Sequence, residues 1–154
     1  MQITFLIYFL ASLIAYLGLL VGIILIRMAP EEQKPGRKYF ILLKKFLFFI
    51  ILIPMLYFYK LNIVFSLALL SLLAALILSN RLKLDKSYPI YVSLGILFYL
   101  SARFIDLFVM EAVLIFLYGI PDASLAFSLK KKNYGGIFIK NLSFFVPAIL
   151  YLAF

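Results

Sequence analysis

The stretch that decides the fold is Ile3–Ile26, ITFLIYFLASLIAYLGLLVGIILI, which runs for 24 residues without a charge. As an α-helix it measures about 36 Å, enough to cross the roughly 30 Å hydrocarbon core of a bilayer. No basic residue precedes it, and its apolar core is longer than that of a signal peptide. We therefore expect a first membrane span that is retained in the protein.

The composition of the whole chain agrees with this interpretation. Of the 154 residues, 67% are hydrophobic and 14% are charged, whereas soluble proteins have about 25% charged residues. So few charges cannot cover the surface of about 8,000 Å² that a folded monomer of this size exposes. A water-soluble domain is therefore excluded. We expect an all-α, polytopic integral membrane helix bundle that forms one transmembrane domain over residues 1–154.

Two further apolar blocks are each too long for one span. Tyr39–Leu78 has 40 residues and Tyr88–Leu129 has 42, and each measures about 60 Å as a single helix. Polar residues near the middle of each block, at Lys60–Asn62 and Arg103–Asp106, divide it into two helices. Six spans are expected, at residues 3–26, 39–59, 61–78, 88–105, 108–129 and 137–154.

The net charge of +9 indicates membrane orientation and not nucleic acid binding. Basic residues favour the connections on the cytoplasmic side. With six spans, 13 of the 15 basic residues lie in the first, third and fifth connections or in the span ends that adjoin them, and only Lys60 and Arg103 lie at the second and fourth. We expect both termini outside the plasma membrane of a prokaryote, with anionic lipid headgroups bound at the basic cytoplasmic loops.

The first connection, residues 27–38, contains two prolines and a glycine. This content predicts a loop with at most one helical turn, broken at Pro35–Gly36. Lys44 and Lys45 follow within the first two turns of the second span. Because long aliphatic stems let lysines extend to the headgroups, we expect both ammonium groups in the interfacial region.

Small residues predict where membrane helices pack, since they let two backbones approach closely. We expect the first and third spans to form an internal core, with some surface left for a membrane protein partner or a second copy of the chain. The small residues on one face are Ala11, Ala15, Gly18 and Gly22 in the first span, and Ser71 and Ala75 in the third.

Arg103, Asp106 and Glu111 are the densest group of ionisable residues near an apolar block. Arg103 and Asp106 are three residues apart and can form an ion pair on one helix. Glu111 would fall in the first turn of the fifth span, where the helix dipole favours an acid. The group is either an ion-paired cap of the outer turn or a place where an ion or substrate enters.

The run GIPDAS, residues 119–124, lies within the fifth span. Pro121 removes one backbone hydrogen bond, which predicts a kink or break. Asp122 would then follow the break, in the position where broken transporter helices hold ions. The alternative is a helix that ends early, with Asp122 and Ser124 capping a short interfacial segment.

The chain has no cysteine and no histidine, so it lacks thiolate ligands, imidazole ligands and the commonest general base. We expect no cofactor and no metal. Three functions remain open. The first expectation is a structural or accessory subunit of a membrane complex, because short loops and small-residue faces occur without a catalytic constellation. The alternative is a small transporter or ion-conducting protein that uses Asp122, and the third is a lipid-acting membrane enzyme.

Overall fold

The computed structural model describes residues 3–78, 87–127 and 134–147. In these ranges the chain is helical apart from short turns, which confirms the all-α prediction with six helices. The elements are α1 (Phe5–Met28), the 3-10 turn η1 (Pro30–Glu32), α2 (Gln33–Phe58), α3 (Ile63–Leu78), α4 (Ser87–Ser101), α5 (Ile105–Ala126), α6 (Tyr134–Asn141) and the 3-10 turn η2 (Leu142–Phe145).

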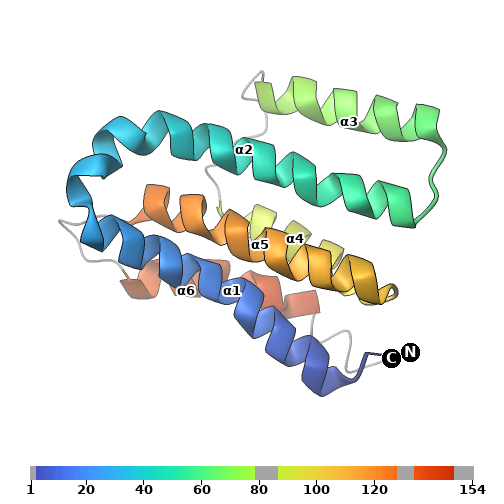
Figure 1. The fold of residues 1–154 in the computed structure, drawn as a ribbon, viewed down its shortest axis with the longest axis horizontal. Helices are drawn as coiled ribbons and strands as arrows, with labels where there is room; N and C mark the ends of the chain where they lie inside the picture. Colours follow the sequence, from blue (N-terminus) through green and yellow to red (C-terminus); the bar gives the residue numbers. More distant parts are fainter. Residues whose placement is uncertain (1–2, 79–86, 128–133, 148–154) are drawn as a thin grey trace.

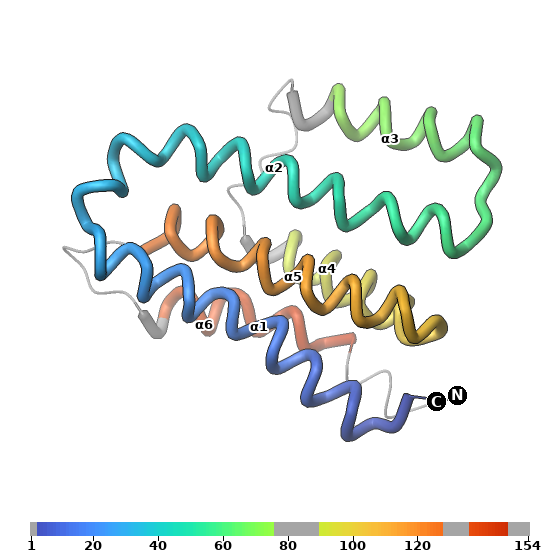
Figure 2. Tube along the Cα trace, in the orientation of Figure 1, coloured from blue at the N-terminus to red at the C-terminus, as the bar shows by residue number. Residues whose placement is uncertain are grey.

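Successive helices alternate in direction, so that their connections gather at two opposite ends of the molecule (Figures 1 and 2). The turns after α2 and α4 lie at one end, and η1 lies at the other together with the end of α5. We call the end at η1 the basic end, because Arg27, Lys34, Arg37 and Lys38 surround it. The basic connections expected at residues 79–86 and 130–132 lie outside the described residues.

The central helix is α5, against which α1, α2 and α4 all pack. α1 runs in the same direction as α5, because Gly18 faces Phe116 and Gly119 while Gly22 faces Ile120. The backbones are so close that a Cβ atom on Gly18 would lie 1.9 Å from the carbonyl oxygen of Phe116. The small face of α1 therefore packs on α5.

The predicted core of the first and third spans is wrong. Ala15 is buried and Ala11 half-buried on the face of α1 that also carries Gly18 and Gly22, and Gly119 supplies the matching small residue on α5. α3 contacts mainly α2, and its side chains from Ile63 to Ala75 are all exposed or half-buried. Ser71 and Ala75 are exposed, and the Ser71 hydroxyl donates to the Ala68 carbonyl on its own helix at 2.9 Å.

The loop predicted for residues 27–38 is almost entirely helical. α1 continues to Met28, η1 follows at once, and α2 begins at Gln33 with Pro35 and Gly36 in its first turn. The first N–H groups of a helix have no acceptor within it, so a proline there costs no hydrogen bond. The predicted break at Pro35–Gly36 is therefore wrong.

The last span also differs from the prediction. α6 ends at Asn141 and continues as the tighter turn η2, so residues 137–147 do not form one uniform α-helix. η2 lies against α4 at Gly95, where a Cβ atom would come within 2.4 Å of the Phe144 carbonyl oxygen. Residues 148–154 of the expected span lie outside the described part of the chain.

Candidate functional site

An ion pair joins Lys44 of α2 and Asp122 of α5. Both residues are buried, with 5% and 3% of their surface exposed. Lys44 shares the buried face of α2 with Leu47 and Ile51, and Asp122 shares the buried face of α5 with Tyr118. Because α2 and α5 are antiparallel neighbours, the two charges reach the same level of the bundle.

The expected interfacial position of the Lys44 ammonium group is wrong. Residues 44, 47, 51 and 55 recur at helical spacing and form the face that α2 turns inward. The stem of Lys44 therefore leads into the bundle, where the carboxylate of Asp122 is its partner. Lys45, one position further along, is half-buried.

The predicted break at Pro121 is also wrong, since α5 continues through it to Ala126. Pro121 and Asp122 are both buried inside the helix, so Asp122 does not cap a separate interfacial segment. Ser124 is no cap either, because its hydroxyl lies 2.8 Å from the Ile120 carbonyl on α5 and 3.3 Å from the Gly22 carbonyl on α1.

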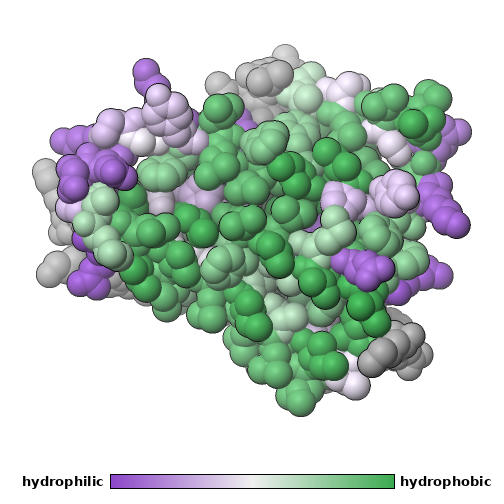
Figure 3. Space-filling view, in the orientation of Figure 1, coloured by the Kyte–Doolittle hydropathy of each residue, from purple (hydrophilic) through white to green (hydrophobic). Residues whose placement is uncertain are grey.

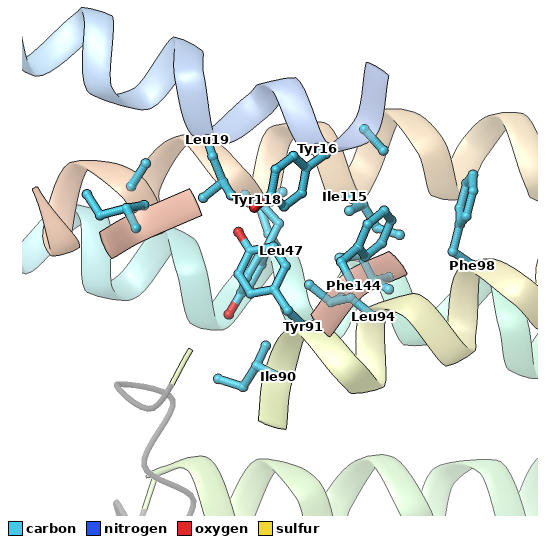
Figure 4. Close-up of a cluster of buried hydrophobic side chains, with 14 of the residues drawn as sticks. Tyr16, Leu19, Leu47, Ile90, Tyr91, Leu94, Phe98, Ile115, Tyr118 and Phe144 are labelled. Atoms are coloured by element: carbon cyan, nitrogen blue, oxygen red, sulfur yellow. The ribbon is translucent and has the colours of Figure 1, made fainter. Parts of the chain in front are cut away.

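Two tyrosines complete the surroundings of the ion pair. The Lys44 Nζ atom lies 5.9 Å from the centre of the Tyr118 ring, within the range of a cation–π interaction. Tyr91 of α4 meets Tyr118 edge to face, with ring centres 6.2 Å apart. Figure 4 shows both rings deep among the buried apolar side chains. We call Lys44, Tyr91, Tyr118 and Asp122 the Lys44–Asp122 cluster.

The cluster has unused hydrogen-bonding capacity. The hydroxyl oxygens of Tyr91 and Tyr118 and the Oδ2 atom of Asp122 are buried without a hydrogen-bond partner. Buried polar atoms normally have one, and a buried atom without a protein partner can bind water, an ion or a ligand. Two hydroxyl donors and a carboxylate acceptor suit a small polar or charged ligand that enters between the helices.

Gln33, which sequence reasoning missed, joins the basic end of α2 to the end of α5. Its side-chain amide donates to the carbonyl oxygens of Ser124, at 3.1 Å, and Phe127, at 2.7 Å. The last carbonyl groups of a helix receive no hydrogen bond from an N–H group of the same helix. The Gln33 amide therefore satisfies carbonyl groups that would otherwise need water. The two hydrogen bonds hold the basic end of α5 against α2, a few residues beyond Asp122.

The structure does not bring Arg103, Asp106 and Glu111 together. α4 ends at Ser101 and α5 begins at Ile105, so Arg103 lies in the turn between them and not on the helix of Asp106. Both side chains are exposed, and no ion pair joins them. The ion-paired cap is therefore wrong. Asp106 occupies the first turn of α5, whereas Glu111 lies in the second turn, fully buried.

The described residues contain no group of three or more acidic, histidine or cysteine side chains that could hold a metal ion. The candidate site is thus the Lys44–Asp122 cluster, with Glu111 as a separate buried acid on the same helix. Comparison with protein-family models, with curated proteins and with solved structures finds no match to this chain.

Proposed function

We propose that the chain is a multi-pass integral membrane protein whose bundle crosses the plasma membrane of a prokaryote. Two segments, Phe5–Met28 and Pro30–Phe58, are long and apolar enough to span a bilayer. In Figure 3 apolar side chains cover the middle of the visible face, while hydrophilic ones gather toward its two ends. Large apolar side chains such as Leu6, Ile14 and Leu42 are exposed, as contact with lipid requires.

We further infer that the protein is a small transporter or ion-conducting protein, with the Lys44–Asp122 cluster as its site. The observation that carries this proposal is the burial of Lys44 and Asp122 in an otherwise apolar bundle. Charged residues inside a membrane protein are costly and mark ion and substrate pathways. Apolar residues of similar volume would hold α2 and α5 together at least as well.

The chemistry of the cluster suits exchange of a bound cation or proton. A positive ion that reaches Asp122 competes with Lys44 for the carboxylate. Tyr91 and Tyr118 supply uncharged hydroxyl groups beside it.

The test is ion movement by the purified protein in lipid vesicles. Wild-type protein should dissipate a pH or cation gradient, and Asp122→Asn should abolish this activity. Asp106→Asn is the matched control, because it removes an exposed acid from the same helix. To separate function from folding, the double variant Lys44→Gln/Asp122→Asn removes both charges together. Ion movement by a folded double variant at the wild-type rate would contradict the proposal.

A second function, an accessory subunit of a membrane complex, is favoured by α3. Its described side chains are all at least partly exposed, and an apolar groove of about 440 Å³ separates it from the second half of α2. Ile53, Tyr57 and Leu70 contribute to the lining of this groove. Purification from the native source in mild detergent tests this function, since a subunit brings a stoichiometric partner and a transporter acts without one.

A further inference from the structure

A second acidic side chain lies inside the bundle, away from the Lys44–Asp122 cluster. Glu111 of α5 has no exposed surface, and neither of its carboxyl oxygens has a hydrogen-bond partner. It precedes Asp122 by 11 residues, or about 16 Å along the helix. Leu107 and Ile115, one turn away on either side, are buried and apolar. Glu111 is therefore a site of its own.

Among the described residues, no cation forms an ion pair with Glu111. Lys44 is the sole buried base among the described residues, and it is paired with Asp122. At the end of the molecule opposite the basic end, Arg103 is exposed in the turn before α5.

The other polar groups on the helices around α5 are uncharged. Ser12 of α1 and Ser101 of α4 each donate to a carbonyl of their own helix, at 2.7 Å. The ring of Tyr8 of α1 packs against the rings of Phe98 and Phe108, at centroid distances of 5.2 and 5.9 Å. The half-buried tyrosines Tyr59 and Tyr99 lie near the carboxyl-terminal ends of α2 and α4. On α5 itself, Tyr118 and Asp122 belong to the Lys44–Asp122 cluster.

These surroundings select the ion that Glu111 can bind. A carboxylate without a partner in an apolar interior takes up a proton instead of keeping its charge. Metal cations such as Ca²⁺ and Mg²⁺ need about six oxygen ligands, and the described residues hold no metal-binding group. A proton needs a single oxygen atom. We propose that Glu111 is a proton-binding site and, resting on the proposed transport function, that the ion this protein moves is H⁺.

The first experiment tests proton binding without any transport assay. Dicyclohexylcarbodiimide partitions into apolar regions and adds to a protonated carboxyl group. The carboxyl oxygen bonds to the carbodiimide carbon, the acid proton moves to a nitrogen, and rearrangement leaves a stable N-acylurea that contains all atoms of both reactants. In vesicles near neutral pH, peptide mapping should find this adduct on Glu111, and the exposed acids Asp106 and Glu31 should stay unmodified.

An infrared measurement covers the case in which the reagent does not reach the site. The spectrum of the wild-type protein should contain the C=O band of a protonated carboxylic acid, and Glu111→Gln should lack it. The Asp106→Asn control should keep the band. If wild-type protein shows neither the adduct nor the band, the proton-binding assignment is overturned.

Vesicle assays then separate this inference from the proposed function. Glu111→Gln should slow the loss of a pH gradient by about tenfold or more, the equivalent of 1.36 kcal/mol in the barrier, while Asp106→Asn should not. If Na⁺ or K⁺ moves and H⁺ does not, the assignment of H⁺ is overturned and the transport proposal stands. If Glu111 carries the adduct but no ion moves, the transport proposal fails and the proton-binding site stands.

Discussion

Lys44 and Asp122 depend on each other, because both are buried and form an ion pair. Removing one partner of a buried pair typically costs about 3 to 5 kcal/mol. Replacing both by apolar residues of similar size is often neutral or stabilising. The stability of variants in this cluster should therefore be strongly non-additive.

Asp122→Asn should lower the free energy of unfolding by about 3 kcal/mol, since it breaks the buried ion pair with Lys44. The double variant Lys44→Met/Asp122→Leu should recover most of this loss. Unfolding by sodium dodecyl sulfate in mixed micelles measures both effects. If the costs of Lys44→Met and Asp122→Leu simply add up in the double variant, the coupling is contradicted. Asp106→Asn should change the free energy of unfolding by no more than about 1 kcal/mol, through the helix dipole.

Tyr118 allows a test that separates function from stability. Its hydroxyl has no hydrogen-bond partner, so Tyr118→Phe should leave the free energy of unfolding within about 0.5 kcal/mol of wild type. Ion movement should fall by about five- to tenfold if the hydroxyl donates one hydrogen bond of about 1 kcal/mol to the passing ion. Unfolding and vesicle assays on one preparation check both expectations. An unchanged transport rate would show that the Tyr118 hydroxyl takes no part in ion movement.

The arrangement of the helices depends on how closely α1 approaches α5. Gly18 and Gly119 face each other across this contact, and a Cβ atom on Gly119 would lie 2.8 Å from the Gly18 backbone. Lipid tails are as apolar as the helices, so van der Waals contact between backbones is a main source of association. Substitutions of these glycines should therefore separate the two helices.

Gly18→Ala should destabilise the bundle by about 1 to 3 kcal/mol, because the new methyl group overlaps the Phe116 carbonyl. Gly136 of α6 provides the control, since a Cβ atom there meets no atom within 4 Å. Gly136→Ala should raise stability by about 0.5 kcal/mol through helix propensity. Equal effects of the two substitutions, measured by unfolding in micelles, would contradict the close α1–α5 contact.

Gln33→Leu should loosen the basic end of α5, since two carbonyl groups lose their donor. We expect a loss of about 1 to 3 kcal/mol and faster hydrogen–deuterium exchange in residues 123–127. Lys34→Leu is the control, because Lys34 is exposed beside Gln33 on the same turn. Exchange that is unchanged in Gln33→Leu would show that the end of α5 is held by other contacts.

The sequence predicted the number of helices well because block length and charge-free runs depend only on local composition. It failed at Pro35, where a proline in a first helical turn looks the same as a proline in a loop. Small residues predicted that α1 packs closely but not on which helix, and Gly119 was the missing counterpart. The pairing of Lys44 with Asp122 depends on the register of α2 against α5, which no local pattern contains. The buried position of Lys44 could have been predicted from its helical spacing to Leu47 and Ile51.

At the scale of the whole molecule, the alternation of helix directions and the position of the basic residues together predict how the bundle is oriented in the membrane. The basic end carries Arg27, Lys34, Arg37 and Lys38, and the opposite end carries Lys60 and Arg103. Basic residues are retained on the cytoplasmic side. The basic end should therefore face the cytoplasm.

The absence of cysteine makes this orientation simple to test. The single substitution Glu31→Cys, in η1, should resist a membrane-impermeant maleimide in intact cells. The single substitution Asn62→Cys, in the turn after α2, should react with it. Both should react after the cells are broken, which controls for accessibility. Labelling of Glu31→Cys but not Asn62→Cys in intact cells would show that the protein has the opposite orientation. Labelling of both sites would contradict a membrane span between them.

The contact between Gly18 and Gly119 joins positions about 100 residues apart in the chain. Ribosomes add about 5 to 20 residues per second, so α1 leaves the ribosome roughly 5 to 20 s before α5 is complete. During this interval the glycine face of α1 lacks its partner surface on α5. The bundle therefore closes late in synthesis, and substitutions at Gly18 should act on the yield of assembled protein as well as on its final stability.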